Sequence, residues 1–248
     1  MSVIKRPHSG KGVAAKRPGQ SLKPKDAATL IIVRQDGPKP RILMGKRHEN
    51  HAFMPNLYVF PGGRIDKADS RVKPATTLHP DVETKLLVRM RGTPSKGRAQ
   101  ALAMTAVRET FEETGLVLGQ EAEAAGKSAH ADWNQFLATG MRANLAPLRY
   151  FARAITPPGR TRRFDSRFFV ADGAHVPNLD SPIAVDSDEL LQINWLTIAE
   201  TEDLDLPWIT RQVLSALERQ ISQPGGVTPG GPVMFQYQRG NSWHADTL

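Results

Sequence analysis

The chain has 248 residues, with 33 lysine and arginine residues against 25 acidic ones and no cysteine. The lack of cysteine excludes disulfides and thiolate nucleophiles, and it leaves only oxygen and imidazole ligands for any metal. No apolar run approaches the ~20 residues that a membrane helix needs. We therefore expect a soluble protein of a reducing compartment, the cytoplasm.

The net charge of +8 is concentrated at one end of the chain. Residues 1–25 hold seven basic residues and no acidic one, so the remaining 26 basic residues nearly balance the 25 acids. A segment rich in Lys, Arg, Pro and Gly buries little apolar surface, which predicts a disordered basic tail over 1–26. The near-neutral remainder argues against a long nucleic acid as a partner, and the lack of a long apolar run argues against a membrane partner.

Three apolar segments follow the tail. Strands are expected over 27–34 and 41–47, because Asp36-Gly37-Pro38 between them is turn chemistry. A short third strand, 57–60, leads into Pro61-Gly62-Gly63, where glycine allows the backbone to come close to a ligand.

A long helix is predicted after an insertion that we assign to residues 70–98, which itself holds a short helix at 81–90. The long helix should run from about Ala99 to Gly115, the residue type that most often adopts the left-handed conformation after a helix. The helical period places Ala103, Met104, Val107 and Phe111 on one face and Glu109, Glu112 and Glu113 on the opposite one.

The rest of the chain shows the same patterns, with Gly- and Pro-rich turns as boundaries. Residues 223–248 contain two such turns, 224–226 and 229–232, and are expected to form a loop-rich C-terminal extension. The remaining expected elements are helices at 133–137 and 207–220, and strands at 148–155, 164–171, 190–196 and 233–238.

Three glutamates on the long helix point to a metal site. Glu109, Glu112 and Glu113 are spaced i, i+3 and i+4, so their carboxylates crowd together on one side of the helix. Mg²⁺ and Mn²⁺ prefer such oxygen ligands, and Mg²⁺ completes its shell with water and substrate phosphates. The carbonyls of Gly62 and Gly63 can approach the same ion. A solvated helix face is the alternative for the three glutamates taken alone.

A longer motif decides against that alternative. The run Arg108-Glu109-Thr110-Phe111-Glu112-Glu113-Thr114-Gly115-Leu116, with Gly63 upstream, resembles the Nudix box G-x5-E-x7-R-E-U-x-E-E-x-G-U, in which U is a bulky aliphatic residue. Two positions depart from it: Thr110 replaces the first U, and Asp69 replaces the first Glu. The 38 residues between Asp69 and Arg108 stand where the pattern has seven.

The resemblance implies an α/β/α sandwich with a mixed sheet over residues 27–222, with the insertion between the glycine loop and the helix of the box. It implies that Glu109, Glu112 and Glu113, with Gly63, hold Mg²⁺ or Mn²⁺, and that Glu109 or another nearby acid is the base. Arg108 would orient the cluster through an ion pair with Asp69 or Asp66.

The segments 53–66 and 163–169, with the interrupted box, resemble the Nudix subgroup that includes peroxisomal acyl-coenzyme A diphosphatases. This resemblance implies hydrolysis of a diphosphate bond in coenzyme A or acyl-coenzyme A. The candidate substrate-binding residues are Arg64, Arg163 and Phe164. A solvated loop tip is the alternative for Arg163, and a core position is the alternative for Phe164. A later acid among Asp186, Asp188 and Glu189 is a further candidate ligand or base, although a solvated turn before a strand is the favoured interpretation of these three residues.

Other functions on the same fold stay open. ADP-ribose, NADH and nucleotide sugars are alternative small-molecule substrates, and a capped RNA end is a further one. A regulatory domain that binds a nucleotide without cleaving it is another class, although such domains tend to lose acids of the box. A homodimer is a further expectation that the sequence leaves open.

Overall fold

The computed structural model describes residues 22–50, 53–183 and 190–248. A nine-stranded mixed sheet runs in the order β11-β10-β7-β8-β1-β2-β3, with β4 paired to β1 and β9 paired to β2. Its strands are β1 (Lys25–Arg34), β2 (Arg41–Arg47), β3 (Tyr58–Val59), β4 (Gly62–Arg64), β7 (Arg149–Ile155), β8 (Phe164–Asp172), β9 (Leu190–Thr197), β10 (Met234–Arg239) and β11 (Ser242–Thr247). A separate two-stranded sheet consists of β5 (Gly119–Glu121) and β6 (Met141–Ala143).

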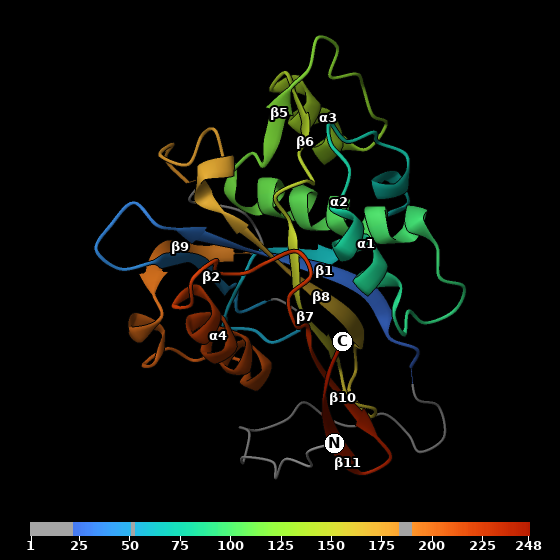
Figure 1. The fold of residues 1–248 in the computed structure, drawn as a ribbon, viewed down its shortest axis with the longest axis vertical. Helices are drawn as coiled ribbons and strands as arrows, with labels where there is room; N and C mark the ends of the chain where they lie inside the picture. Colours follow the sequence, from blue (N-terminus) through green and yellow to red (C-terminus); the bar gives the residue numbers. More distant parts are fainter. Residues whose placement is uncertain (1–21, 51–52, 184–189) are drawn as a thin grey trace.

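Helices cover both faces of the large sheet, with α1, α2 and α3 on one face and α4 on the other (Figure 1). The helices are α1 (Pro80–Leu87), α2 (Lys96–Thr114), α3 (Ala131–Ala138) and α4 (Trp208–Ile221), and the 3-10 turns are η1 (Lys67–Ser70), η2 (Gly173–His175) and η3 (Ala199–Thr201). The predicted α/β/α sandwich with a mixed sheet is confirmed.

The alternation of side chains along β1 creates the two layers. Leu30 and Ile32 pack into the core under α2, whereas Ile31 and Val33 pack into the core under α4. Successive side chains of a strand point to opposite faces, so an unbroken apolar run is required where both faces are covered. The sequence 30–33 is such a run.

Strand β4 places the glycine turn beside the centre of the sheet. Gly62 pairs with Thr29 and Gly63 pairs with Ala28 of β1. A β-carbon on Gly62 would lie 2.5 Å from the carbonyl oxygen of Ala28 and 2.7 Å from the α-carbon of Thr29. Only glycine allows the two backbones to approach this closely.

Helix α2 begins three residues before the predicted start and ends where expected. Ser95 caps its first turn by accepting from the N–H of Arg98 at 3.2 Å, and Gly115 adopts a φ of 74° after its last residue. The acidic residues predicted on the face opposite the core are not a solvent-exposed set, because Glu109 and Glu113 are both buried. The sheet, α1 and α3 all pack against this helix. Its acidic side chains are therefore covered by protein, like its apolar side chains.

Several strands were not expected from the sequence. The third strand is only Tyr58–Val59, and β4, β5, β6 and β11 were missed. The predicted loop-rich extension contains a hairpin, because β10 pairs with both β11 and β7 and so extends the large sheet. The predicted tail is also too long at its end, since β1 begins at Lys25. Among the described residues, no helix has the length and apolar character needed to cross a membrane.

Buried ion pairs lock the strand that follows the 156–163 loop. Arg153 of β7 makes two hydrogen bonds of 2.8 Å to the two carboxylate oxygens of Asp165 of β8. Arg167 donates to Asp26 of β1 at 2.8 Å, so charged groups link three neighbouring strands. Arg153, Asp165 and Arg167 are at most 1% exposed. A buried charge is stable only while its partners remain.

We therefore predict that Asp165→Asn lowers the free energy of unfolding by about 3–5 kcal/mol, because it leaves two buried guanidinium groups without their shared carboxylate. Urea denaturation measures the change. The matched control is Lys96→Ala, which removes an ion pair of 2.7 Å to Glu83 from a lysine side chain that is 79% exposed. That variant should show no measurable change. Equal effects of the two substitutions would contradict the prediction.

Candidate active site

A buried ion pair between Arg108 and Asp69 joins the two parts of the interrupted box. The Nε of Arg108 donates to Oδ1 of Asp69 at 2.8 Å, and its Nη2 donates to Oδ2 at 3.2 Å, across 39 positions of sequence. Asp69 is fully buried and Arg108 is 4% exposed. Asp66, the other acid considered for this pair, caps η1 instead by accepting from the N–H of Ala68 at 2.8 Å. The 38-residue spacer therefore begins and ends at the same place.

Neutral donors complete the surroundings of the Asp69 carboxylate. It accepts hydrogen bonds from Oγ1 of Thr105 at 2.8 Å, Nε1 of Trp133 at 2.7 Å and the N–H of Asp66 at 2.8 Å. Burial alone would raise the pKa of Asp69, but the hydrogen bonds and charge of Arg108, with the other donors, hold that pKa below its ordinary value. Asp69 is therefore a permanently ionised group at neutral pH.

Arg108 also contacts two of the three glutamates. Its Nη2 lies 2.8 Å from Oε1 of Glu109, and its Nη1 lies 3.1 Å from Oε2 of Glu112. Arg108 therefore reaches two glutamates of its own helix in addition to Asp69. Burial would lower the pKa of Arg108, but Asp69 and Glu109 outweigh it and raise that pKa above its ordinary value. Arg108 is thus a fixed positive charge between one buried acid and two acids nearer the surface.

The glycine turn positions the other ends of the glutamates. The N–H of Gly62 donates to Oε2 of Glu113 at 2.9 Å. A β-carbon on Gly63 would lie 2.3–2.5 Å from the carboxylate atoms of Glu109. The absence of a side chain at Gly63 therefore creates the space that the Glu109 carboxylate occupies.

The donor chemistry of this cluster fits a hard divalent cation. Glu109, Glu112 and Glu113 provide carboxylate oxygens on one helix, and glycine backbone lies against two of them. Within the described residues, no three Asp, Glu or His side chains form a ready-made metal-binding group. The candidate later acids, Asp186, Asp188 and Glu189, lie outside the described residues.

The three candidate substrate-binding residues lie around the beginning of β1. Arg64 is exposed and follows Gly63, on one edge of β1, while Phe164 pairs with Lys25 on the other edge. The ring of Phe164 packs edge-on against that of Phe53, with 5.1 Å between the ring centroids. Arg163 donates to the carbonyls of Thr156 at 2.9 Å and Leu22 at 2.6 Å.

The three candidate residues differ in the contacts that they make within the fold. Arg163 stabilises the chain that enters β1, and burial together with Arg91 lowers its pKa. Phe164 is half-buried at the start of β8. Arg64 is exposed at the position directly after Gly63.

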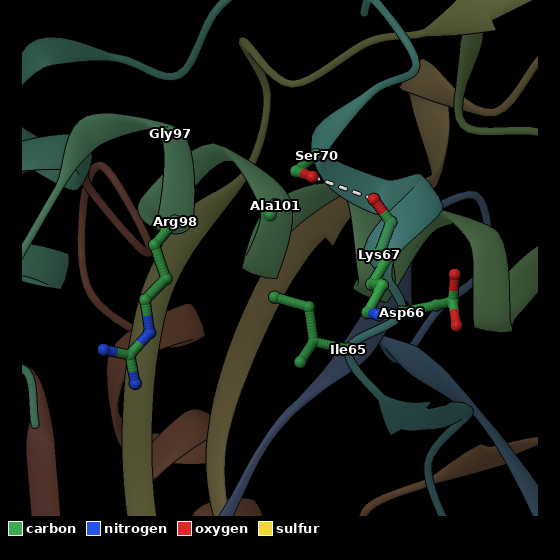
Figure 2. Close-up of a pocket in the computed structure, with 7 residues that line it drawn as sticks. All are labelled: Ile65, Asp66, Lys67, Ser70, Gly97, Arg98 and Ala101. Atoms are coloured by element: carbon green, nitrogen blue, oxygen red, sulfur yellow. Dashed lines mark hydrogen bonds between the residues drawn. The ribbon is translucent and has the colours of Figure 1, made fainter. Parts of the chain in front are cut away.

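A pocket of about 330 Å³ opens between the segment after β4 and the first turns of α2. Figure 2 shows Lys67 and Arg98 on either side of Ile65, with Ala101 above them on the helix. Arg98 is committed to Asp26, to which its Nε donates at 2.6 Å. The pocket lies on the N-terminal half of α2, about two helical turns before Glu109.

Thr105 and Trp133 are the contributors to the site that sequence reasoning missed. Both bind Asp69, and neither belongs to a recognisable spacing, because Trp133 comes from α3 and Thr105 is an ordinary helix residue. Their participation depends on where Asp69 lies after a 38-residue spacer. A helix was expected at 133–137 and is observed at Ala131–Ala138, but nothing in its sequence connects Trp133 with Asp69.

Residues 24–207 match the family model of the NUDT19 Nudix domain. The chain belongs to the Nudix hydrolase family. The curated relatives include nudix hydrolase 7 of Caenorhabditis elegans, 28% identical over 192 positions that cover 72% of this chain and 53% of the relative. Another is the acyl-coenzyme A diphosphatase NUDT19 of Xenopus laevis, 25% identical over 205 positions that cover 64% of this chain and 53% of the relative.

The chain thus spans about half the length of these two curated relatives. Among solved structures, a NUDIX hydrolase from Alicyclobacillus acidocaldarius has a TM-score of 0.61 and 25% identity, with coverage of 84% of this chain and 99% of that one. The resemblance to the Nudix family, and to its subgroup of acyl-coenzyme A diphosphatases, is confirmed.

The ion pair between Arg108 and Asp69 predicts that the free energy of unfolding depends on pH. The folded pKa of Asp69 is depressed, so its stabilisation is present above the unfolded value of about 4 and is lost as the pH falls through the lower folded value. We expect Asp69→Asn to cost about 3 kcal/mol at pH 7, and the difference from wild type to shrink below about pH 4. Urea denaturation in EDTA between pH 7 and pH 3 measures both. A difference that does not change with pH would contradict this assignment.

Proposed function

We propose that this Nudix domain is a Mg²⁺- or Mn²⁺-dependent diphosphohydrolase that cleaves a nucleoside diphosphate linked to another group. The observation that carries the proposal is that Arg108 contacts Glu109 and Glu112, while Glu113 accepts from the N–H of Gly62 and Glu109 lies against Gly63, although 38 residues interrupt the box. A domain that only binds nucleotides has no need to keep this arrangement.

Coenzyme A and acyl-coenzyme A are the first substrates to test. The match to the NUDT19 Nudix domain covers most of the chain, and the Xenopus laevis relative is named an acyl-coenzyme A diphosphatase. The cleavage would release 3',5'-ADP and a phosphopantetheine product. ADP-ribose, NADH and nucleotide sugars share the diphosphate and are the competing substrates.

Glu109, Glu112 and Glu113, with the Gly63 carbonyl, are the groups that would hold the cation. When bound, the cation would neutralise the diphosphate and lower the pKa of a water molecule. We assign Glu109 the role of base, because it lies against Gly63 and accepts from Arg108, which fixes its carboxylate.

Arg108 and Arg64 have different roles in this proposal. Arg108 is buried and fixes the glutamates, so it acts on the substrate only through them. Arg64 would donate to a phosphate oxygen from its exposed position after the turn. Phe164 and Arg163 would contact the nucleoside from across β1.

The proposal predicts the outcome of a substrate panel. Purified protein with Mg²⁺ or Mn²⁺ is tested on coenzyme A, acyl-coenzyme A, ADP-ribose, NADH and nucleotide sugars, with release of each nucleotide measured by chromatography. Glu112→Gln should reduce turnover by at least about 100-fold, as loss of one transition-state charge contact typically does. It should leave the fold intact, because the Glu112 side chain is 39% exposed.

Release of 3',5'-ADP from the coenzyme A compounds supports the full proposal. Cleavage of another substrate keeps the diphosphohydrolase and removes the coenzyme A assignment. Binding of nucleotides without turnover would overturn the catalytic assignment in favour of a regulatory domain. Full activity of Glu112→Gln at limiting Mg²⁺ would instead contradict the assignment of Glu112 as a metal ligand.

The two neighbouring glycines give a second prediction. Gly63→Ala should cost little stability, because its new methyl group meets only the flexible end of Glu109, yet it should displace that carboxylate and lower turnover at least about tenfold. Gly62→Ala meets backbone atoms and should cost about 1–3 kcal/mol. Thermal denaturation and steady-state kinetics of both variants separate the effects. A fully active Gly63→Ala would refute the position assigned to Glu109.

A further inference from the structure

Trp133 reaches the candidate active site from outside the Nudix box. It lies on α3, is fully buried, and donates from its indole Nε1 to Oδ1 of Asp69 at 2.7 Å. Its ring packs edge-on against that of Phe136, with 5.3 Å between the ring centroids. The ring of Phe136 packs in the same way against that of Phe111 of α2, with 5.2 Å between the centroids. Aromatic packing thus fixes the indole relative to the helix that carries the glutamates.

The hydrogen bond matters because Asp69 is shorter by one methylene than the glutamate expected at its position in the box. Its carboxylate is fixed from three directions, by Trp133 of α3, Thr105 of α2 and the N–H of Asp66. All three donors are neutral. The full negative charge of Asp69 therefore stays available to Arg108.

The position of Asp69 controls how strongly Arg108 holds the glutamates. The same guanidinium contacts Asp69 on one side and Glu109 and Glu112 on the other, at 2.8 Å, 2.8 Å and 3.1 Å. A divalent cation at the glutamates must compete with Arg108 for their oxygens. If Asp69 shifts away, the positive charge of Arg108 is balanced by the two glutamates alone, and the competition becomes stronger.

We propose that Trp133 is a positioning residue that sets the affinity of the site for its divalent cation. It acts through Asp69, by keeping the carboxylate where it balances Arg108 and so leaves Glu109 and Glu112 available to the metal. The inference rests on the proposed function only in placing the cation at these glutamates.

The test measures binding of Mn²⁺ alone to the full chain, without substrate, by the electron paramagnetic resonance signal of free Mn²⁺. Trp133→Phe keeps an aromatic ring and removes the donor, and should weaken Mn²⁺ binding about tenfold, the effect of losing one hydrogen bond to a charged group. Leu137→Val is the matched control, since Leu137 is on the same helix and is also buried, and it belongs neither to the hydrogen bonds of Asp69 nor to the aromatic packing around Trp133. Its Mn²⁺ affinity should match wild type.

Thr105→Val covers the case in which Trp133→Phe fails to fold. It removes a different donor to the same carboxylate with almost no change of shape, and should also weaken Mn²⁺ binding. In an Asp69→Asn background, Trp133→Phe should have much less effect on Mn²⁺ binding than in wild type, because the two act through one contact. In the single variant Trp133→Phe, in which Asp69 is unchanged, excess Mn²⁺ should restore turnover.

The outcomes separate the two proposals. If wild type binds Mn²⁺ and Trp133→Phe binds it as tightly as Leu137→Val does, the role of Trp133 is refuted and the proposed function stands. If the effects of Trp133→Phe and Asp69→Asn simply add, action through Asp69 is refuted. If wild type does not bind Mn²⁺, the metal site of the proposed function fails first.

Discussion

The buried pair between Arg108 and Asp69 is the contact on which the rest of the site depends. It joins the short turn after β4 to the middle of α2, and neither group is more than 4% exposed. Two buried charges are stable together and costly apart, so the pair allows essentially one relative position of turn and helix. The three glutamates lie within the next five residues of the helix, and their positions follow from it.

The same pair explains how a motif survives a long interruption. The cost of closing a loop grows slowly with its length, so 38 residues in place of seven are a modest burden if both ends are held. Here the ends are held by charge and by hydrogen bonds to Asp69, while α1 packs its own apolar residues, Val82 and Leu86, into the core beside α2. The spacer thus contributes α1 to the core that packs against α2.

Local chemistry made much of this structure predictable. The apolar run 30–33 and the turn at 36–38 identify the central strands, and Gly115 identifies the end of α2. The box identifies which acids belong together. Short strands such as β4 and β11 were missed, because three to six residues with few apolar positions carry no period that distinguishes a strand from a loop. Their pairing with β1 and β10 is decided by the rest of the sheet.

The site itself was predictable as a set of residues but not as an arrangement. Helical spacing places three glutamates together, yet it does not show that Glu113 is fixed by the N–H of Gly62, or that Glu109 fills the space above Gly63. Nor does it show that a tryptophan from another helix completes the hydrogen bonds of Asp69. These contacts join segments far apart in sequence, where no local pattern relates one residue type to another. A motif therefore identifies the groups that do the chemistry, while the residues that fix their positions come from the whole fold.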